Sequence, residues 1–409
     1  MPRPGQVTSS SRERLSDRIA VGVLTRAFPP ELIDEVLAAT GRGEQRKRLL
    51  PARVVVYFVL AMCLFRREGY EEVTRLLTEG LVWARRWKGQ WRVPTTAALS
   101  RARARLGPEP LQALFERVAA PVATASTAGA WYRGRRLVAV DGTTFDLADT
   151  AANGEHFGRP GSSRGDGKSA YPQVRVAALA ECGTHAIVAA ATGPLATTET
   201  TLAPRLFPAL EPGMLLLADR GFLSFALWRA AAATGADLLW RARSSAVLPV
   251  VTQFDDGSYT SEIVASSDHR KRADPITVRV IEYTLTDGGT VYRLVTTLLD
   301  PHAAPATELA ALYAQRWEIE TALDELKTHQ GGPNLILRSQ HPPGVEQELY
   351  GFLLTHHALR ELIHHTADTT ATDPDRISFI RTLRVVRRQV TNQAAFSPDA
   401  TETLTEPHP

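Results

Sequence analysis

The stretch that decides the fold class is GMLLLADRGF, residues 213–222. An unbroken apolar run leads into Asp219, and Gly221 follows two residues later. Such a run suits a strand that is covered on both faces, as in the sheet of an α/β protein. A carboxylate directly after a buried strand is costly unless something charged meets it. Ligand sites in α/β sheets gather at the carboxyl ends of strands. The stretch therefore predicts a buried strand with a site at its end.

A second stretch, RRLVAVDGTTFDLAD at 135–149, has the same design. We place Asp141 at the end of its apolar strand and interpret Asp146 and Asp149, which follow, as loop acids. Further β-type segments are expected at 172–182 and 185–195, and a helix at 223–236. This alternation of strands and helices predicts an α/β core.

The pattern changes along the chain and suggests several units. Helical periodicity dominates up to about residue 130, a Val/Thr-rich segment with turn dipeptides begins at 237, and helices resume at 305. We therefore divide the chain into a disordered tail (1–16), a helical N-terminal domain (17–130), a first core part (131–236), a β-rich insertion (237–304), the last core helices (305–365), and a linker with a basic helix and tail (366–409).

Composition limits the classes of protein that fit. The formal net charge is only +3, so any argument for nucleic-acid binding must rest on where the charges lie. The two cysteines, Cys63 and Cys182, form no disulfide framework or CxxC pair, which fits a reducing cytoplasm. The longest apolar run, Val54–Phe65, is shorter than the roughly 20 residues that span a bilayer. We expect a cytoplasmic protein with no membrane segment and no signal peptide.

The stretch YAQRWEIETALDELK, residues 313–327, sorts its charges when it is placed on a helical wheel. One arc of about 60° holds an aromatic hydroxyl, two cations and one acid: Tyr313, Arg316, Glu320 and Lys327. Glu318 and Glu325 fall on the opposite side, which we assign to the outside. The hydroxyl and the cations suit phosphate oxygens, and a carboxylate among them would require a metal ion. The alternative is an amphipathic surface helix with intrahelical ion pairs.

Asp141, Asp219 and Glu320 would together supply a site made only of carboxylates. Oxygen ligands without cysteine or histidine favour Mg²⁺ or Mn²⁺. Paired ions of this kind activate the attacking oxygen at a phosphodiester and stabilise the leaving one. Each aspartate taken alone would also be explained as a turn or cap residue.

These motifs together resemble one known family. Residues 313–327 match the pattern Y-x2-R-x3-E-x6-K at every position, with DG at 141–142 and DRGF at 219–222. Over most of its length the chain resembles a DDE transposase of the insertion-sequence-four type, the group named for its YREK signature. The resemblance implies an RNase H-like core interrupted by a β-rich insertion. It also implies roles for the signature residues: a catalytic triad of Asp141, Asp219 and Glu320 that holds two Mg²⁺ (or Mn²⁺) ions, and contacts to the DNA backbone by Tyr313, Arg316 and Lys327.

The activity implied by the resemblance is cut-and-paste DNA transposition. A metal-activated water would free a 3′-OH at the element end, and that 3′-OH would attack a second phosphodiester. The partners would be double-stranded DNA, as terminal inverted repeats and target, and a second copy of the chain, because two ends must be cut in concert. The setting would be a bacterial cytoplasm, in association with the nucleoid. Two alternatives are a domesticated, catalytically inactive DNA-binding protein and a metal-dependent structure-specific nuclease. The intact triad argues against the inactive DNA-binding protein. The core alone does not distinguish a transposase from a structure-specific nuclease.

Basic segments suggest where DNA would lie. Residues 82–107 carry seven Arg or Lys and no acid, which is typical of a phosphate-binding face. We expect Arg101, Arg103 and Arg105 to bind DNA from the second helix of a helix-turn-helix-like unit, with Thr95 or Thr96 as its N-cap, and the three tryptophans of 83–91 to pack in the core. The Arg-rich segment 376–390 is either another backbone contact or a solvated face. Some relatives hold a flipped base with an aromatic residue of the insertion, for which Trp240 and Tyr292 are candidates without assignment.

Overall fold

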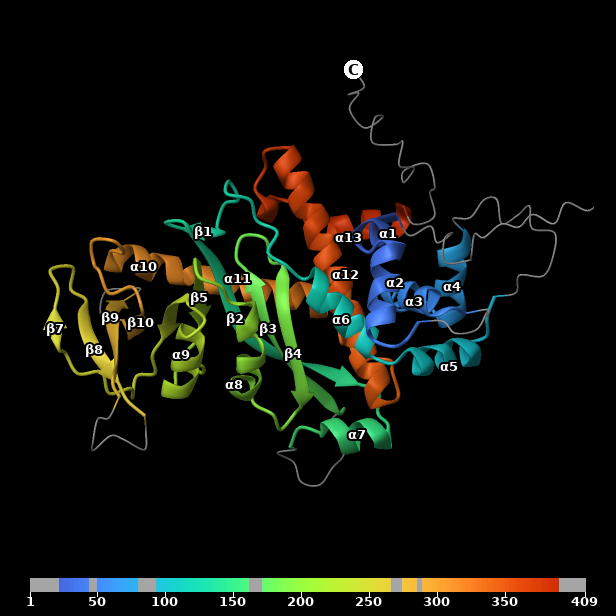
Figure 1. Cartoon of the computed structure of the whole chain (residues 1–409), viewed down its shortest axis with the longest axis horizontal. Coiled ribbons are helices and arrows are strands. Elements are labelled where there is room, and N and C mark those ends of the chain that lie inside the picture. Colours follow the sequence, from blue (N-terminus) through green and yellow to red (C-terminus); the bar gives the residue numbers. More distant parts are fainter. Residues whose placement is uncertain are drawn as a thin grey trace, which may run out of the picture.

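One large mixed sheet organises the chain (Figure 1). The computed structural model describes residues 22–43, 50–79, 93–161, 171–265, 274–284 and 289–389. The main path of the sheet has the order β4-β3-β2-β5-β6-β10-β9-β8-β7, and the short strands β1 (Trp131–Tyr132) and β11 (Ile336–Leu337) also pair with β2. The predicted α/β class, with a mixed sheet and flanking helices, is confirmed. The predicted tail 1–16 and the three tryptophans of 83–91 lie outside the described residues.

Five strands form the core of the sheet: β2 (Arg135–Leu147), β3 (Gln173–Glu181), β4 (Ile187–Pro194), β5 (Met214–Ala218) and β6 (Asp237–Arg241). β3 pairs antiparallel with both β2 and β4, whereas β5 runs parallel to β2 and β6. The run 214–218 that predicted a buried strand is β5, and it is fully buried. A central strand covered on both faces explains why its sequence is continuously apolar rather than alternating.

The insertion extends this same sheet instead of forming a separate unit. Its strands are β7 (Thr252–Gln253), β8 (Tyr259–Ile263), β9 (Ile276–Thr284) and β10 (Val291–Thr296). β10 pairs antiparallel with β6, so the two parts share a continuous ladder. The predicted boundary at residue 237 is therefore wrong, because 237–241 is the parallel core strand β6 and the insertion begins after Arg241.

The predicted end of the Asp141 strand is also wrong. β2 continues through Asp141 to Leu147, because β3 stays paired with it as far as the Asp146–Gln173 position. Asp146 is thus a strand residue, and its carboxylate accepts a hydrogen bond from the Gln173 side-chain amide at 2.8 Å. What ends near Asp141 is the neighbouring strand β5, whose last residue pairs with Val140.

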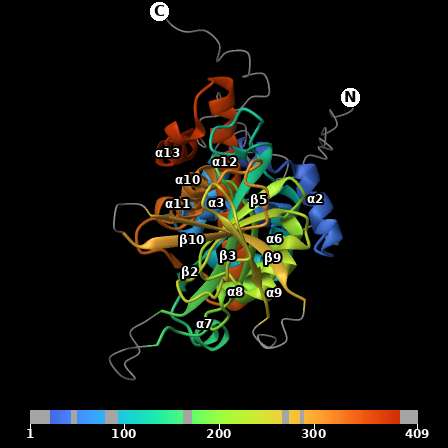
Figure 2. The ribbon, with the colours of Figure 1, turned by 90° about the vertical axis from the view of Figure 1, so that its left-hand side faces the viewer.

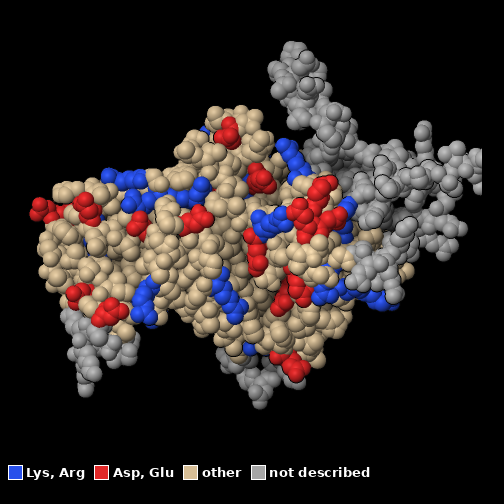
Figure 3. Space-filling model, in the orientation of Figure 1, with Lys and Arg blue, Asp and Glu red and all other residues tan. Residues whose placement is uncertain are grey.

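Helices cover the two faces of the sheet differently (Figure 2). Side chains alternate along β5, so that Leu215 and Leu217 join one hydrophobic cluster while Leu216 and Ala218 join the other. The second cluster packs under α8 (Glu199–Leu202) and α9 (Phe225–Ala232), whereas the first packs under α11 (Trp317–Asp324) and α12 (Pro342–Thr369). Figure 3 views the α8 and α9 face, where cations and acids are interspersed. The remaining helices of the core are α7 (Ala151–Phe157), α10 (Ala306–Leu312) and α13 (Phe379–Gln389).

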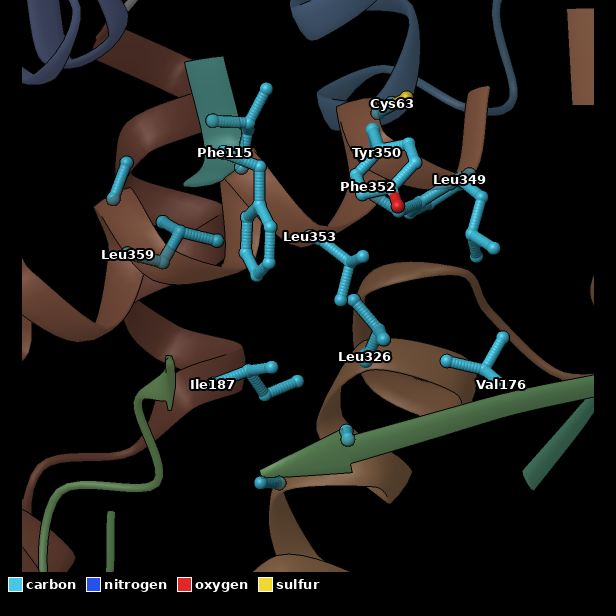
Figure 4. Packing of buried hydrophobic residues seen from close by; sticks show 14 of the residues in the cluster. Cys63, Phe115, Val176, Ile187, Leu326, Leu349, Tyr350, Phe352, Leu353 and Leu359 are labelled. Carbon is cyan, nitrogen blue, oxygen red and sulfur yellow. The ribbon is translucent and has the colours of Figure 1, made fainter. Parts of the chain in front are cut away.

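The N-terminal helices lie at one end of the long axis, opposite the insertion strands (Figure 1). They are α1 (Gly22–Ala27), α2 (Pro30–Ala39), α3 (Ala52–Leu64), α4 (Tyr70–Glu79), α5 (Thr96–Leu106) and α6 (Glu109–Val118). In Figure 4, Cys63 of α3 and Phe115 of α6 lie among side chains of α12. These helices therefore share one hydrophobic core with α11, α12 and one face of the sheet. α12 itself runs to Thr369, past the boundary predicted at 365.

Among the helices in the described part of the chain, none is both long enough and apolar enough to cross a bilayer.

Candidate active site

The strand register brings two of the predicted carboxylates together. Val140 of β2 pairs with Ala218 of β5 in a parallel ladder, so Asp141 and Asp219 are the next residues on adjacent strands. Side chains alternate along a strand, and both aspartates follow the parity of the face that α11 covers. Each carboxylate also accepts a local backbone hydrogen bond, from Gly142 N–H at 2.8 Å and from Gly221 N–H at 2.6 Å.

Glu320 joins this pair from α11 through Arg316. The Arg316 guanidinium lies 2.8 Å from Glu320 Oε1 and 3.6 Å from Asp141 Oδ2. It thus bridges a strand carboxylate and a helix carboxylate, and it stacks its Cζ 4.7 Å from the Trp317 ring. The structure therefore places Asp141 and Glu320 at one guanidinium, and the strand register sets Asp219 directly after β5, next to the strand that carries Asp141.

The helix that carries Glu320 is less regular than its sequence predicts. The stretch 313–327 begins as a 3₁₀ turn, η6 (Tyr313–Arg316), continues as α11, and ends in a π-helical turn, η7 (Glu325–Gln330). A uniform 100° wheel does not hold across such a turn. The Tyr313 hydroxyl is buried and donates to the Ala218 carbonyl at 3.0 Å. Tyr313 thus ties η6 to the strand end before Asp219, and its predicted DNA contact stays a prediction.

Lys327 lies farther along the same face. Its Nζ is 5.9 Å from the ring centre of Phe145, four residues beyond Asp141 on β2. At about 3.3 Å per strand residue, that is roughly 13 Å from Asp141. The signature residues thus lie along β2 from Asp141 towards Phe145, and Lys327 is half-buried.

Asp141 is a carboxylate that the fold makes costly to ionise. Burial raises the pKa of Asp141 to about 6; Glu199 and Glu320 add to this, while the Gly142 N–H and Arg316 lower it. Sequence reasoning missed Glu199, which packs on Gly142 so closely that a Cβ there would lie 2.3 Å from Glu199 Cγ. Gly142, directly after Asp141, was the signal available in the sequence, because a residue without a side chain permits Glu199 to pack this closely. Glu199 pairs with Arg175 at 3.0 Å.

The chemistry of these donors fits a hard divalent cation. The site offers carboxylate oxygens from two strands and a helix, which are the ligands that Mg²⁺ and Mn²⁺ prefer. A buried carboxylate with a raised pKa gains most from a nearby cation. Among the described residues, the group whose ligand atoms all lie within 4.8 Å of one another is a different one, His185, Glu318 and Asp375, on the other side of α11.

The prediction that Glu318 and Glu325 face the outside is wrong. Glu318 Oε2 lies 2.5 Å from His185 Nε2, and Glu325 is buried against Arg360 of α12, with Arg360 Nε at 2.8 Å from its Oε2. The wheel was correct that both acids point away from Glu320. The wheel did not show that other parts of the chain pack against the side of the helix that carries these two acids.

The predicted DNA-binding arginines of α5 divide into two kinds. Arg103 is buried, and its guanidinium donates to Gln347 Oε1 at 2.7 Å and to Ser339 Oγ at 2.9 Å. These bonds attach α5 to α12 and to Ser339, which precedes α12, and the DNA contact predicted for Arg103 stays a prediction. Arg101 and Arg105 are exposed on the same helix. The N-cap prediction is confirmed at Thr95, whose hydroxyl accepts from Ala98 N–H at 3.3 Å.

The two aromatic candidates of the insertion also differ. Trp240 is buried and packs edge-on against Trp228 at 5.2 Å, so it belongs to the core. Tyr292 is half-buried and stacks on Tyr283 at 5.5 Å, with the Arg241 guanidinium 4.5 Å from its ring centre.

Comparison with known proteins gives consistent matches over most of the chain. The family described as "Insertion element 4 transposase N-terminal" matches residues 18–116, and "Transposase DDE domain" matches residues 132–356. Transposase InsG for insertion sequence element IS4, from Escherichia coli strain K12, is 30% identical over 376 residues, which cover 90% of this chain and 83% of that protein. Putative transposase InsZ of the same organism is 26% identical over 197 residues, 48% of this chain and 62% of that protein.

A solved structure of a piggyBac transposase synaptic complex with hairpin DNA aligns at a TM-score of 0.47. It is 11% identical, and the alignment covers 96% of this chain and 83% of that one. This likeness is too low to carry an argument about the present site.

Proposed function

The chain belongs to the IS4-type DDE transposases, and we propose that it carries out cut-and-paste transposition with Asp141, Asp219 and Glu320 as its catalytic triad. It is a DNA transposase, an enzyme of a family that uses divalent metal ions. The observation that supports the triad best is that Asp141 and Glu320 meet at one guanidinium beside the end of β5, where Asp219 follows.

The residues around the triad would each have a distinct task. Asp141 lies within the paired strand β2, Asp219 directly follows the paired strand β5, and Glu320 comes from α11. They would hold two Mg²⁺ or Mn²⁺ ions. When bound, the ions supply an activated oxygen nucleophile and stabilise the leaving oxygen. Arg316 pairs with Glu320 and Asp141, and the same guanidinium would contact a phosphate held at the triad.

The DNA backbone would run along the face marked by Arg316 and Lys327. Lys327, roughly 13 Å from Asp141 along β2, would bind a phosphate away from the one that is cut. Exposed Arg101 and Arg105 of α5 would bind the element end farther out. The protein would act as a homodimer on two inverted repeats and a target duplex, in a bacterial cytoplasm and associated with the nucleoid.

An in vitro assay with the flanking terminal repeats and Mg²⁺ tests this proposal. We expect cleavage at the element end followed by joining of the new 3′-OH to target DNA. Cleavage without joining would favour the structure-specific nuclease, and binding without cleavage would favour the inactive DNA-binding protein. Equal cleavage by Glu320→Gln and the native chain would show the triad assignment to be wrong.

A further inference from the structure

The side of α11 that faces away from the triad carries a buried set of ionic groups that the catalytic role does not use. Glu318 and Glu325 come from α11 and η7, His185 from the turn between β3 and β4, and Arg360 from α12. We call these four residues the back network; Asp375 of η8 (Pro374–Arg376) borders it, with its Oδ1 3.6 Å from His185 Nε2.

The back network contacts the catalytic helix at two points, on either side of Glu320 in sequence. At the first, Glu318 Oε2 is 2.5 Å from His185 Nε2 and also accepts a hydrogen bond from the Gly183 backbone. At the second, Glu325 Oε2 is 2.8 Å from Arg360 Nε and 3.4 Å from His356 Nε2. The first joins the helix to the sheet and the second joins it to α12.

Local backbone conformations accompany both contacts. His185 has φ +57, in the left-handed region that is uncommon for residues other than glycine, although Asn, Asp and His are enriched there. Glu325 begins the π-helical turn, a feature that is common at functional sites. Conformations of this kind persist when surrounding contacts determine them, as the pairs with Glu318 and Arg360 do here.

A metal site is not the best explanation of this cluster, although His185, Glu318 and Asp375 have suitable ligand atoms. Both imidazole nitrogens of His185 already have partners, since Nε2 meets Glu318 and Nδ1 contacts the Arg360 guanidinium. Because Nε2 carries a proton when it donates to Glu318, it cannot also bind a cation.

We propose that the back network is a positioning device, in which Glu318 and Glu325 fix the rotation and height of α11 so that Glu320 lies opposite Asp141. The inference rests on the proposed triad. Tyr313, whose hydroxyl bonds the Ala218 carbonyl, holds the preceding turn, and the back network holds the rest. A carboxylate displaced by about 1 Å is expected to lower the rate by about 10²-fold. Binding of DNA, which uses other residues, should change little.

The test compares Glu318→Ala with a matched control, Asp256→Asn. Asp256 pairs with buried Arg279 at 2.5 Å in the insertion, so the control also weakens a buried ion pair, but one that does not contact α11. Mn²⁺ binding to the full chain is measured calorimetrically without DNA, and end cleavage and end-DNA affinity are measured separately. We expect Glu318→Ala to weaken Mn²⁺ binding at least tenfold and lower cleavage about 10²-fold, with DNA affinity within about twofold. Asp256→Asn should leave Mn²⁺ binding within about twofold.

Glu318→Gln keeps the test decisive if the alanine variant folds poorly. Its amide oxygen still accepts from His185 Nε2, so we expect it to recover most of the Mn²⁺ affinity. Native Mn²⁺ binding in a folded Glu318→Ala, or equal weakening by the control, would overturn the positioning role. Asp141→Asn separates the two proposals: if it too binds Mn²⁺ and cleaves like the native chain, the triad fails, whereas loss there with native behaviour at Glu318 refutes positioning alone.

Discussion

Two acids near α11, the half-buried Asp141 on the triad side and the buried Glu325 on the back side, show opposite electrostatics. Burial opposes ionisation of both. For Asp141 burial prevails, and its pKa rises to about 6. For Glu325, hydrogen bonds from His185 and His356 and the charge of Arg360 outweigh burial and hold its pKa well below its usual range. The comparison teaches that burial alone does not identify a functional acid. An acid that the fold leaves poorly compensated is the better candidate for binding a cation.

The largest expected effect is on end cleavage, and it would come from neutralising an acid on the triad side, where the negative charge is poorly compensated. Asp141→Asn or Glu320→Gln should lower end cleavage by about 10³-fold or more, equal to about 4 kcal/mol of transition-state stabilisation. Stability at neutral pH should be unchanged or higher for Asp141→Asn, because the carboxylate it removes is costly to ionise. Cleavage kinetics and urea denaturation measure the two effects. A large loss of stability with either variant would break the contrast between the two sides.

Removing Glu325, the acid whose charge is compensated, should instead have its main effect on stability. Glu325→Ala leaves Arg360 buried without its carboxylate, and we expect the free energy of unfolding to fall by about 3–5 kcal/mol. Glu35→Ala, which removes an exposed partner of Arg117, is the control and should cost less than about 1 kcal/mol. Denaturant unfolding followed by tryptophan fluorescence measures both. Equal losses would show that the Glu325 pair is no more important to the fold than a surface ion pair.

Stability should depend on pH through His185. Burial disfavours its imidazolium, but Glu318 and Glu325 outweigh burial and raise the pKa of His185 from 6.5 to about 9. The proton is bound more tightly in the folded chain, so the stabilisation is fully present below pH 6.5 and is lost as pH rises through 9. It amounts to about 3 kcal/mol at most. Unfolding experiments across this window should show a smaller decline for His185→Asn. An equal decline would assign the pH dependence to other groups.

The smallest effects should come from α5, where the same contrast separates two arginines. Arg101→Ala should weaken end-DNA binding and reduce the salt slope by about one, with stability within about 0.5 kcal/mol. Arg103→Ala should instead lower stability, because Gln347 and Ser339 lose their buried partner. Filter binding at several salt concentrations, together with thermal unfolding, distinguishes the two. A steeper loss of DNA affinity for Arg103→Ala without destabilisation would reverse this assignment.

Local patterns predicted much of the fold. The apolar run before Asp219 is β5, the run at 54–64 lies in the buried helix α3, and Thr95 caps α5. These features depend on neighbours in sequence, such as unbroken hydrophobicity or a hydroxyl before a helix. The end of β2 was misplaced because it depends on where β3 and β5 stop pairing, which the residues around Asp141 do not encode.

The candidate site was predictable in its residues but not in its surroundings. The spacing of the signature identified Glu320, and strand patterns identified Asp141 and Asp219. The contacts that Tyr313 and Arg103 make within the chain were not foreseen, because hydroxyls and guanidiniums suit main-chain carbonyls and side chains as well as phosphates. Glu199, which adds to the charge around Asp141, approaches from the other face of the sheet and was not foreseen.

The sequence by itself determined the α/β class and the family and pointed to three candidate carboxylates, because these depend on residue types, periods and spacings along the chain. Only the tertiary structure decided which partners lie beside each charged side chain. The β2–β5 register sets Asp141 beside Asp219. His185 and Arg360, far from α11 in sequence, convert Glu318 and Glu325 from expected surface acids into buried supports. The physical reason is that the pKa and the role of an acid depend on which partners the fold brings within a few ångströms.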